Sequence, residues 1–324
     1  MLDFFGSIGS FIMTPLYFAI SFVLTSFHTL FGGIFGPASG VAWVLSIIGL
    51  TLVIRAALIP LFVKQIKSSR NMQLIQPKVK ELQKKYGHDR ERLAQETMKL
   101  YKDTGTNPFA SCLPIILQMP IFLSLFRLID QAVKNPDKPK GVMTETLNNQ
   151  FRDAHFLGAK ISDTFVNTDD NGVRLLAAIL VIAMTATTFL TQRQLMSKNM
   201  PADALSGPYA QQQKMLLYVL PVVFAVGGIA FPVGVLFYWT TSNLWTMGQQ
   251  FYVIRNNPAP GTPAFKAKEE RDKAKAARKG LPEPTTGEAE SSAVATEVEE
   301  RPAPRVQPKR QTKAQRQAKK KPGS

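Results

Sequence analysis

The chain has 324 residues, of which 45% are hydrophobic and 19% charged, and its formal net charge is +16. The hydrophobic residues cluster in long uncharged runs with the charges between and after them, which excludes a soluble globular protein and indicates a polytopic membrane protein. The single cysteine, Cys112, excludes an internal disulfide bond, and three histidines do not provide a Cys/His zinc site.

Residues 1–35 are apolar but carry a weak polar stripe on one helical face. This pattern predicts an interfacial amphipathic helix, and a true membrane span ending near Phe31 is the alternative, because the stripe has no charge other than His28. No Lys or Arg precedes Arg55 to form the basic region of a cleavable signal, so we expect this segment to be retained. The stripe consists of Ser10, Thr14, Ser21, Thr25, His28 and Thr29.

The first certain span, residues 41–63, contains one full charge, Arg55. A charge in hydrocarbon costs about 2.5 to 3.5 kcal/mol on insertion scales, so such a residue tends to face a bundle interior or a water-filled cavity. Snorkelling is the alternative, but the Cα–Cβ bond of Arg55 points away from the end of the helix marked by Lys64. Pro60 lacks a backbone donor and predicts a bend beside the arginine. We interpret Arg55 as a functional residue.

Residues 64–106 are polar, with 11 basic and 5 acidic residues and a net charge of +6. Two helical patterns meet where Gly87 suits a helix C-cap and Asp89 an N-cap. The segment therefore predicts a cytoplasmic helical hairpin. Its sparse apolar residues predict a mobile element near the membrane surface.

Four further spans are predicted after the hairpin, and the charges between them give the topology. Residues 132–174 have six basic and six acidic residues, whereas the loop at 192–214 has a net charge of +2. Because Lys and Arg are enriched on the cytoplasmic side, the amino end is expected outside and the carboxyl end inside. The predicted spans are 108–129, 175–191, 215–231 and 233–254, and the predicted loops are 130–174 outside and 192–214 inside.

Residues 255–324 are rich in Pro, Ala, Glu and Lys, with 17 basic and 9 acidic residues. This composition predicts a disordered basic cytoplasmic tail. Its charge fits anionic lipid or the phosphates of nucleic acid equally well. A tail that only sets the topology is the third interpretation.

The sequence has no HExxH, no phosphate-binding glycine loop, no GxSxG and no acidic residue in the middle of a span. We therefore predict that the protein is not an enzyme, with no catalytic residue, cofactor or metal site. Several polar side chains remain that could share a cavity with Arg55. Each alone is explained as an interhelical hydrogen bond worth about 0.6 kcal/mol, but together with the arginine they predict a hydrophilic groove. They are Gln118, Thr185, Thr188, Gln192, Tyr238, Trp239 and Asn243.

Five blocks within residues 41–255 resemble the YidC membrane protein insertases, which are related to the mitochondrial and chloroplast insertases. They are TLVIRAALIPL, QPKVKELQKKYGHDRERLAQETMKLYK, NPFASCLPIILQMPIFLSLF, TTFLTQRQ and FPVGVLFYWTTSNLWTMGQQ. The resemblance implies an all-α bundle of five transmembrane helices in the bacterial plasma membrane, with a groove open to the cytoplasm and closed toward the outside. It places the positive groove residue at Arg55, with Gln192 and Trp239 as groove partners. The chain is similar to the compact form of the family, without the large outer domain.

We therefore interpret the protein as an insertase that takes hydrophobic clients from the cytoplasm or ribosome into the bilayer, with Arg55 attracting their acidic residues. The expected partners are nascent membrane proteins, the ribosome through the basic tail, membrane lipids and the Sec translocon, and the expected state is a monomer. A channel or transporter for a small anion is the alternative, and a lipid scramblase is a third.

Overall fold

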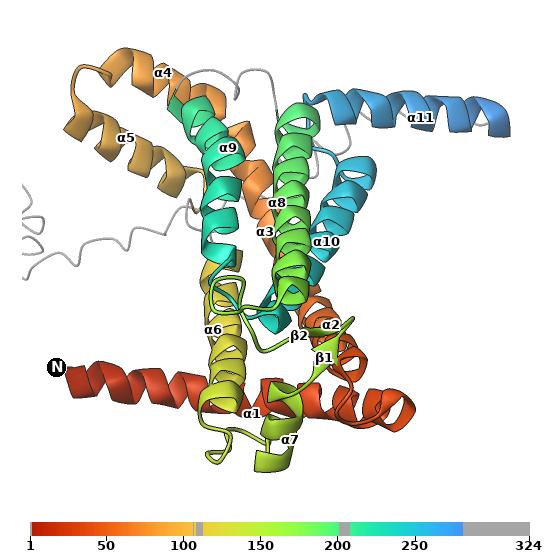
Figure 1. Cartoon of the computed structure of the whole chain (residues 1–324). Helices are drawn as coiled ribbons and strands as arrows, with labels where there is room; N and C mark the ends of the chain where they lie inside the picture. Colours follow the sequence, from red (N-terminus) through yellow and green to blue (C-terminus); the bar gives the residue numbers. More distant parts are fainter. Residues whose placement is uncertain (1, 106, 108–112, 201–207, 281–324) are drawn as a thin grey trace, which may run out of the picture. The chain divides into compact units, whose positions relative to one another are not determined.

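The computed structural model describes residues 2–105, 107, 113–200 and 208–280 (Figure 1). Over these residues the chain is helical apart from one antiparallel pair of two-residue strands. The chain divides into two units, Met1–Lys268 and Glu269–Ser324. The elements are α1 (Leu2–Phe35), α2 (Gly40–Ala57), α3 (Ile59–Leu74), α4 (Gln76–Tyr86), α5 (Arg90–Asp103), α6 (Leu113–Lys134), α7 (Glu145–Arg152), β1 (His155–Phe156), β2 (Ala159–Lys160), α8 (Asn171–Asn199), α9 (Pro208–Gly228), α10 (Val233–Asn256) and α11 (Pro263–Lys279).

Four of the described helices contain stretches long and apolar enough to cross a membrane. They lie in α1, α2, α6 and α8, and α9 contains a shorter apolar helix, Lys214–Gly228. α10 has the length of a span with 24 residues, but the polar run from Tyr238 to Asn243 lowers its hydropathy. The helical character expected from the sequence is thus present, and three of the five predicted spans, in α2, α6 and α8, coincide with these stretches. The stretch in α1, Met13–Phe35, belongs to the helix that the sequence predicts to be interfacial.

The helix that carries Arg55 is interrupted at Leu58. α2 ends at Ala57, and the amide of Leu58 donates to the carbonyl oxygen of Ile54 at 3.1 Å. Pro60 then falls in the first turn of α3, where its missing N–H leaves no helical hydrogen bond unmade. The predicted disturbance beside Arg55 is therefore confirmed, as a break between two helices.

α10 is the central helix of the bundle, because it packs against α8, α2 and α6. The largest cluster of buried hydrophobic residues comes largely from the amino-terminal halves of α2, α8 and α10 and the carboxy-terminal half of α6, with further residues from α1 and the α6–α8 connection. These halves all lie at one end of the bundle, which we call the packed end. Its core includes Trp43, Ile47, Leu50, Leu125, Leu128, Ile129, Val173, Ala177, Val233, Val235 and Leu236.

α1 packs against α2 and α6 at the packed end, and Figure 1 shows it running crosswise to α6 and α8. The backbone N–H of Val142, in the loop after α6, donates to the Ser21 hydroxyl at 2.9 Å. The His28 ring stacks on Trp43 in the first turn of α2, with 3.8 Å between ring centroids. Both contacts lie at the same end of the bundle.

The connection between α6 and α8, predicted as a loop over residues 130–174, is folded over the packed end. α6 continues to Lys134, and α7 and the β1–β2 hairpin follow. Phe151 is 1% exposed, and Ile161 is fully buried. Leu157 and Gly158 form the hairpin turn with φ values of 51° and 84°, as a two-residue turn with both central residues left-handed requires. The loop is therefore part of the core.

The predicted cytoplasmic hairpin is present as α4 and α5, which pack against each other. The carboxylate of Asp89 accepts a hydrogen bond from the amide of Arg92 at 3.0 Å, so the predicted N-cap is confirmed. Among the side chains described in these two helices, only Val79 is buried. The mobility of the hairpin remains a prediction.

The predicted disordered tail needs a correction. α10 continues to Asn256, and residues 263–279 form the helix α11 instead of a disordered segment. Residues 264–279 contain neither Gly nor Pro and consist mostly of the strong helix formers Ala, Lys, Glu and Arg. The amide of Phe265 donates to the Thr262 hydroxyl at 3.3 Å, as at a helix N-cap. Residues 281–324 lie outside the described residues.

The helices also extend beyond the predicted spans. α8 runs from Asn171 to Asn199, so it includes the first part of the predicted 192–214 loop. It begins early because the Asp170 carboxylate accepts a hydrogen bond from the amide of Gly172 at 2.7 Å. Residues 108–112 of the predicted second span, including Cys112, lie outside the described residues.

Candidate functional site

Arg55 is in the last turn of α2, where its side chain contacts α10 and the residue is only 8% exposed. Its Nε donates to the Ser242 hydroxyl oxygen at 3.1 Å, and its Nη2 donates to the same oxygen. The guanidinium carbon lies 5.7 Å from the centroid of the Phe62 ring on α3, a cation–π distance. Arg55 is thus held by a neutral hydroxyl and an aromatic ring.

Two further polar pairs connect α10 to its neighbours. The Gln118 amide on α6 donates to the Tyr238 hydroxyl oxygen. The Asn243 amide donates to the Thr188 hydroxyl on α8 at 2.9 Å. With the Arg55–Ser242 contact, these pairs join α10 to α2, α6 and α8. Polar side chains of adjacent spans commonly form such contacts.

The three pairs lie directly beyond the hydrophobic core, on the side away from the packed end. Along α2 the core ends at Leu50 and Arg55 follows, and along α8 it ends at Val181 and Thr188 follows. α6 runs in the opposite direction, so Gln118 precedes its first core residue, Leu125. Four helices thus change from apolar to polar contacts at one level, and we call the side chains of the three pairs the polar layer: Arg55, Ser242, Gln118, Tyr238, Thr188 and Asn243.

The other predicted site residues lie near this layer but do different things. Trp239 packs edge-on against Phe122 of α6 and Phe224 of α9, with centroid distances of 5.1 and 4.9 Å. Thr185 donates to the carbonyl oxygen of Val181 in its own helix at 2.7 Å. Gln192 is half-buried on α8, one turn beyond Thr188. The structure therefore places Gln118 and Thr188 against α10, which carries Asn243, at the level of Arg55. Trp239 lies instead in an aromatic cluster.

The charge of Arg55 has no carboxylate within 4 Å among the described residues, where the ion pairs involve Lys134, Arg152, Lys160 and Arg174. A buried cation without an anion is costly, and inside a membrane it marks a functional site by default. The described residues also contain no group of three His, Cys, Asp or Glu side chains that could bind a metal ion. The polar layer can therefore attract an anion through the charge of Arg55, and its hydroxyl and amide groups can form hydrogen bonds.

Ser242 and Phe62 are the contacts of Arg55 that the sequence did not reveal. Gln118 is one of the polar side chains that the sequence predicts to share a cavity with Arg55, and in the structure it donates to Tyr238. Ser242 lies 187 residues from Arg55 in the chain. A serine in an apolar helix usually satisfies its hydroxyl within its own helix, so no local signal distinguishes this one.

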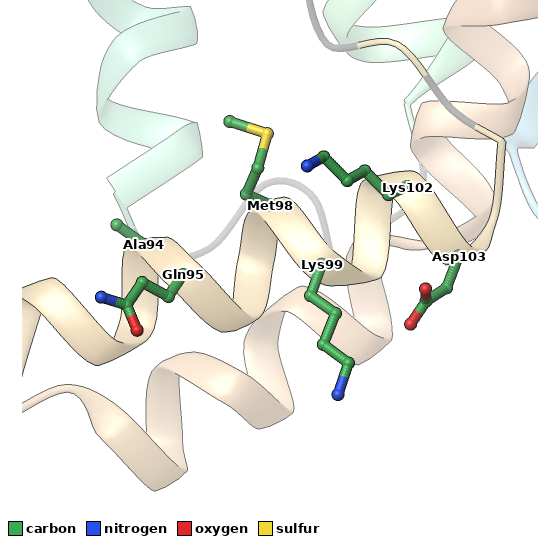
Figure 2. Close-up of a pocket in the computed structure, with 6 residues that line it drawn as sticks. All are labelled: Ala94, Gln95, Met98, Lys99, Lys102 and Asp103. Carbon is green, nitrogen blue, oxygen red and sulfur yellow. The ribbon is translucent and has the colours of Figure 1, made fainter.

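Two hollows lie away from the polar layer. One, of about 470 Å³, is lined by a single face of α5 with Met98 and Lys102 on it (Figure 2). Because only one helix lines it, it is a surface depression. The other, of about 600 Å³, lies between α3 and α10.

Comparison with known proteins identifies the family. The family described as 60Kd inner membrane protein matches residues 34–260. A relative from Streptomyces avermitilis named "Membrane protein insertase YidC" is 47% identical over 83% of this chain and 64% of its own length. Relatives of the same name from Tropheryma whipplei and Bifidobacterium longum are 39% and 34% identical, over 80% and 90% of this chain and 89% and 90% of their own lengths. A solved structure titled "Active YidC insertase crystal structure with the first transmembrane domain resolved" has a TM-score of 0.44 and 24% identity, covering 72% of this chain and 46% of that chain.

The apolar helices, the folded α6–α8 connection and the buried arginine define a polytopic helical membrane protein. The chain belongs to the 60Kd inner membrane protein family, whose relatives given above are the YidC membrane protein insertases. The resemblance drawn from the five sequence blocks is therefore confirmed. Neither the family description nor the names of the relatives describe an enzyme. The chain spans a little under two-thirds of the Streptomyces relative and about nine-tenths of the other two.

Proposed function

We propose that the protein inserts membrane proteins into the bilayer from the cytoplasm, as the names of its relatives state for them. A polar segment of the client would reach the polar layer and be shielded there from lipid. The apolar segment would partition into hydrocarbon, which gains about 0.8 kcal/mol per buried CH₂. The protein would lower the barrier for the polar segment and consume no nucleotide.

One observation carries this proposal: the buried guanidinium of Arg55 is held by the Ser242 hydroxyl, with no carboxylate beside it among the described residues. A hydrogen bond from a charged group such as this guanidinium contributes about 1.5 to 3 kcal/mol net. A carboxylate 4 Å from the guanidinium gains about 4 kcal/mol at an effective dielectric of 20, before desolvation is subtracted. An acidic client side chain can therefore compete with Ser242 for Arg55.

The position of the polar layer supports entry from one side only. The hydrophobic core and the folded α6–α8 connection cover the packed end, which the loop charges assign to the outside. On the other side the buried hydrophobic cluster is small, with Met196, Met200 and Leu217. We infer a groove that opens toward the cytoplasm at the level of Arg55 and is closed beneath it by the packed end.

Photocrosslinking tests this proposal. A photoreactive amino acid at Ser242, which touches Arg55, should crosslink to a ribosome-bound nascent membrane protein during its synthesis, and the same group at the lipid-facing Ile182, 68% exposed, is the control for general proximity. Crosslinks to the client no stronger at residue 242 than at residue 182 would contradict the proposal. Chloride flux through the purified protein in sealed vesicles, with no client crosslink, would favour the anion channel instead.

The membrane topology that we propose has five spans, formed by α2 with the start of α3, α6, α8, α9 and α10, and it leaves α1 on the outer surface. The contacts of α1 support this, because Arg127 near the outer end of α6, Val142 and Trp43 all belong to the packed end. Single cysteines at Phe11 and Ile34, in a Cys112→Ala background, test it. Both positions are exposed in the structure, and an impermeant thiol reagent added outside should label both. Labelling of only one would show that α1 spans the membrane.

We propose that the carboxy-terminal tail binds the ribosome through phosphate attraction. Residues 301–324 contain nine basic residues and no acidic residue. Removing them should weaken ribosome binding and flatten its dependence on salt, because fewer counterions are released. Unchanged affinity and salt slope would leave the tail as a topology signal.

A further inference from the structure

A groove of about 600 Å³ lies between α3 and α10, away from the contacts of the polar layer. Its walls are largely apolar, and its polar lining residues, Gln249 and Asn257, are on the carboxy-terminal part of α10. Ile59 and Val63 are 43% and 48% exposed, so one wall faces the surroundings of the bundle. The lining residues are Ile59, Val63, Ile66, Trp245, Gly248, Gln249, Tyr252, Val253 and Asn257.

The length of the groove matches one leaflet of a bilayer. Its lining on α10 runs from Trp245 to Asn257, which is about 18 Å at 1.5 Å per residue. Half of a hydrocarbon core of about 30 Å is about 15 Å. An acyl chain of the cytoplasmic leaflet can therefore lie along the groove, with its headgroup at the Asn257 end.

Gly248 makes part of this space. A Cβ atom built at Gly248 would have no neighbour within 4 Å. The groove is open at this point, so a larger side chain would extend into it.

The stretches of chain that contribute α3 and the end of α10 carry only positive charges. Residues 56–80 and 244–268 contain no Asp or Glu. Lys64 and Arg255 are exposed and lie within one turn of lining residues on α3 and α10. Each cation near a membrane surface attracts anionic lipid, so the ends of both helices select a negatively charged headgroup over a zwitterionic one.

We propose that the groove between α3 and α10 is a binding site for an anionic phospholipid of the cytoplasmic leaflet. The acyl chain lies against Gly248 and the apolar wall, and the phosphate lies near Lys64 and Arg255. The lipid fills the space between the helix that follows Arg55 and the central helix. This site is independent of client binding at the polar layer, so either can fail without the other.

Native mass spectrometry of the purified protein from vesicles of equal phosphatidylglycerol and phosphatidylcholine tests the site. The full chain should retain phosphatidylglycerol in preference to phosphatidylcholine. Gly248→Leu should lose this preferential binding, because the new side chain occupies the groove. Gly227→Leu is the matched control, since Gly227 is also a helical glycine with no neighbour within 4 Å of an added Cβ, and it should retain the lipid as the unmodified chain does.

The double variant Lys64→Gln, Arg255→Gln tests the headgroup preference separately. Each cation removed should weaken phosphatidylglycerol binding about fivefold and leave phosphatidylcholine binding unchanged. Equal lipid retention by the Gly248→Leu and Gly227→Leu variants would overturn the site. Equal loss of both lipids in the double variant, or none, would overturn its selectivity for anionic lipid.

Discussion

The two ends of the helical bundle are built in different ways. At the packed end, residues of α1, α2, α6, α7, α8 and α10 form one buried hydrophobic cluster. At the other end the second cluster found among the described residues has three buried members, Met196, Met200 and Leu217, and no residue of α5 is buried. The polar layer lies between these two regions. We expect the extensive buried core to hold the packed end closed, which would suit the proposed entry of a polypeptide from the other side.

The largest loss of stability at the packed end is expected from a substitution of Gly40, where α2 contacts β1. A Cβ atom at this position would lie 2.3 Å from the backbone carbonyl of His155. Backbone atoms cannot yield as a flexible side chain can, so Gly40→Ala should separate the hairpin from α2 and cost about 1 to 3 kcal/mol or more. The measurement is the midpoint of thermal unfolding in detergent, which should fall by several degrees.

Gly33→Ala controls for helix propensity, because Gly33 is helical and a Cβ there has no neighbour within 4 Å. This variant should be as stable as the unmodified protein or slightly more stable. If Gly40→Ala unfolded at the same temperature as Gly33→Ala, close packing of the hairpin would not stabilise the packed end.

Hydrogen exchange compares the two regions directly. Amides of α4 and α5 should exchange at least about 100-fold faster than those in the first halves of α2 and α8, because local opening of a segment with few buried apolar contacts costs little free energy. Fast exchange is expected over residues 67–105, within the predicted hairpin at residues 64–106. Protection of α4 and α5 equal to that of α8 would mean that the hairpin is as rigid as the spans.

Much of the bundle could be predicted because its signals are local. The long apolar runs, Pro60 next to Arg55 and the cap at Asp89 each act within a few residues of the chain. The strands β1 and β2 have two residues each, and Leu157 is an unusual residue at a left-handed turn position, so they left no readable pattern. α11 was missed because a composition typical of disorder also contains strong helix formers.

The site could be predicted only in part. The arginine was evident because a charge inside an apolar run is rare, and Gln118, Thr188 and Asn243 followed as polar residues at the same depth. Ser242 was missed because tertiary contacts decide which serine bonds outside its own helix. Trp239 was predicted as a groove partner, yet its large ring packs with Phe122 and Phe224. An indole is both polar and aromatic, and the sequence does not say which property a site uses.

The smallest expected effect concerns the exposed rim of the packed end. The hydrogen bond from Arg152 lowers the pKa of Asp153, and Lys160 across the hairpin adds to this. A carboxyl with a lowered pKa stabilises the fold above its ordinary pKa of about 3.9 and loses this contribution as the pH falls through its folded value. Asp153→Asn should therefore reduce stability at pH 7 by no more than about 0.5 kcal/mol, with no difference from the unmodified protein near pH 2. A larger effect at pH 7 would mean that surface charge, and not packing, holds this end.

Substitution of Arg55 by lysine separates the effect of its charge from the effect of its shape, because lysine keeps the positive charge but lacks the planar guanidinium group. Attraction of an acidic segment needs only the charge, so Arg55→Lys should retain most insertion activity. Ser242→Ala is the companion variant, since it removes the hydroxyl partner and leaves the charge, and it should also remain active. Equal loss in Arg55→Lys and Arg55→Ala would point to a partner that requires the guanidinium.

The most direct measurement is insertion of two clients that differ only in the charge of the translocated segment, acidic in one and neutral in the other, by the unmodified protein and by Arg55→Ala. Removing the cation should lower insertion of the acidic client by at least about tenfold, which is about 1.4 kcal/mol and a fraction of the 4 kcal/mol available before desolvation. Insertion of the neutral client should change much less. An equal defect for both clients would contradict electrostatic attraction and make Arg55 a structural residue.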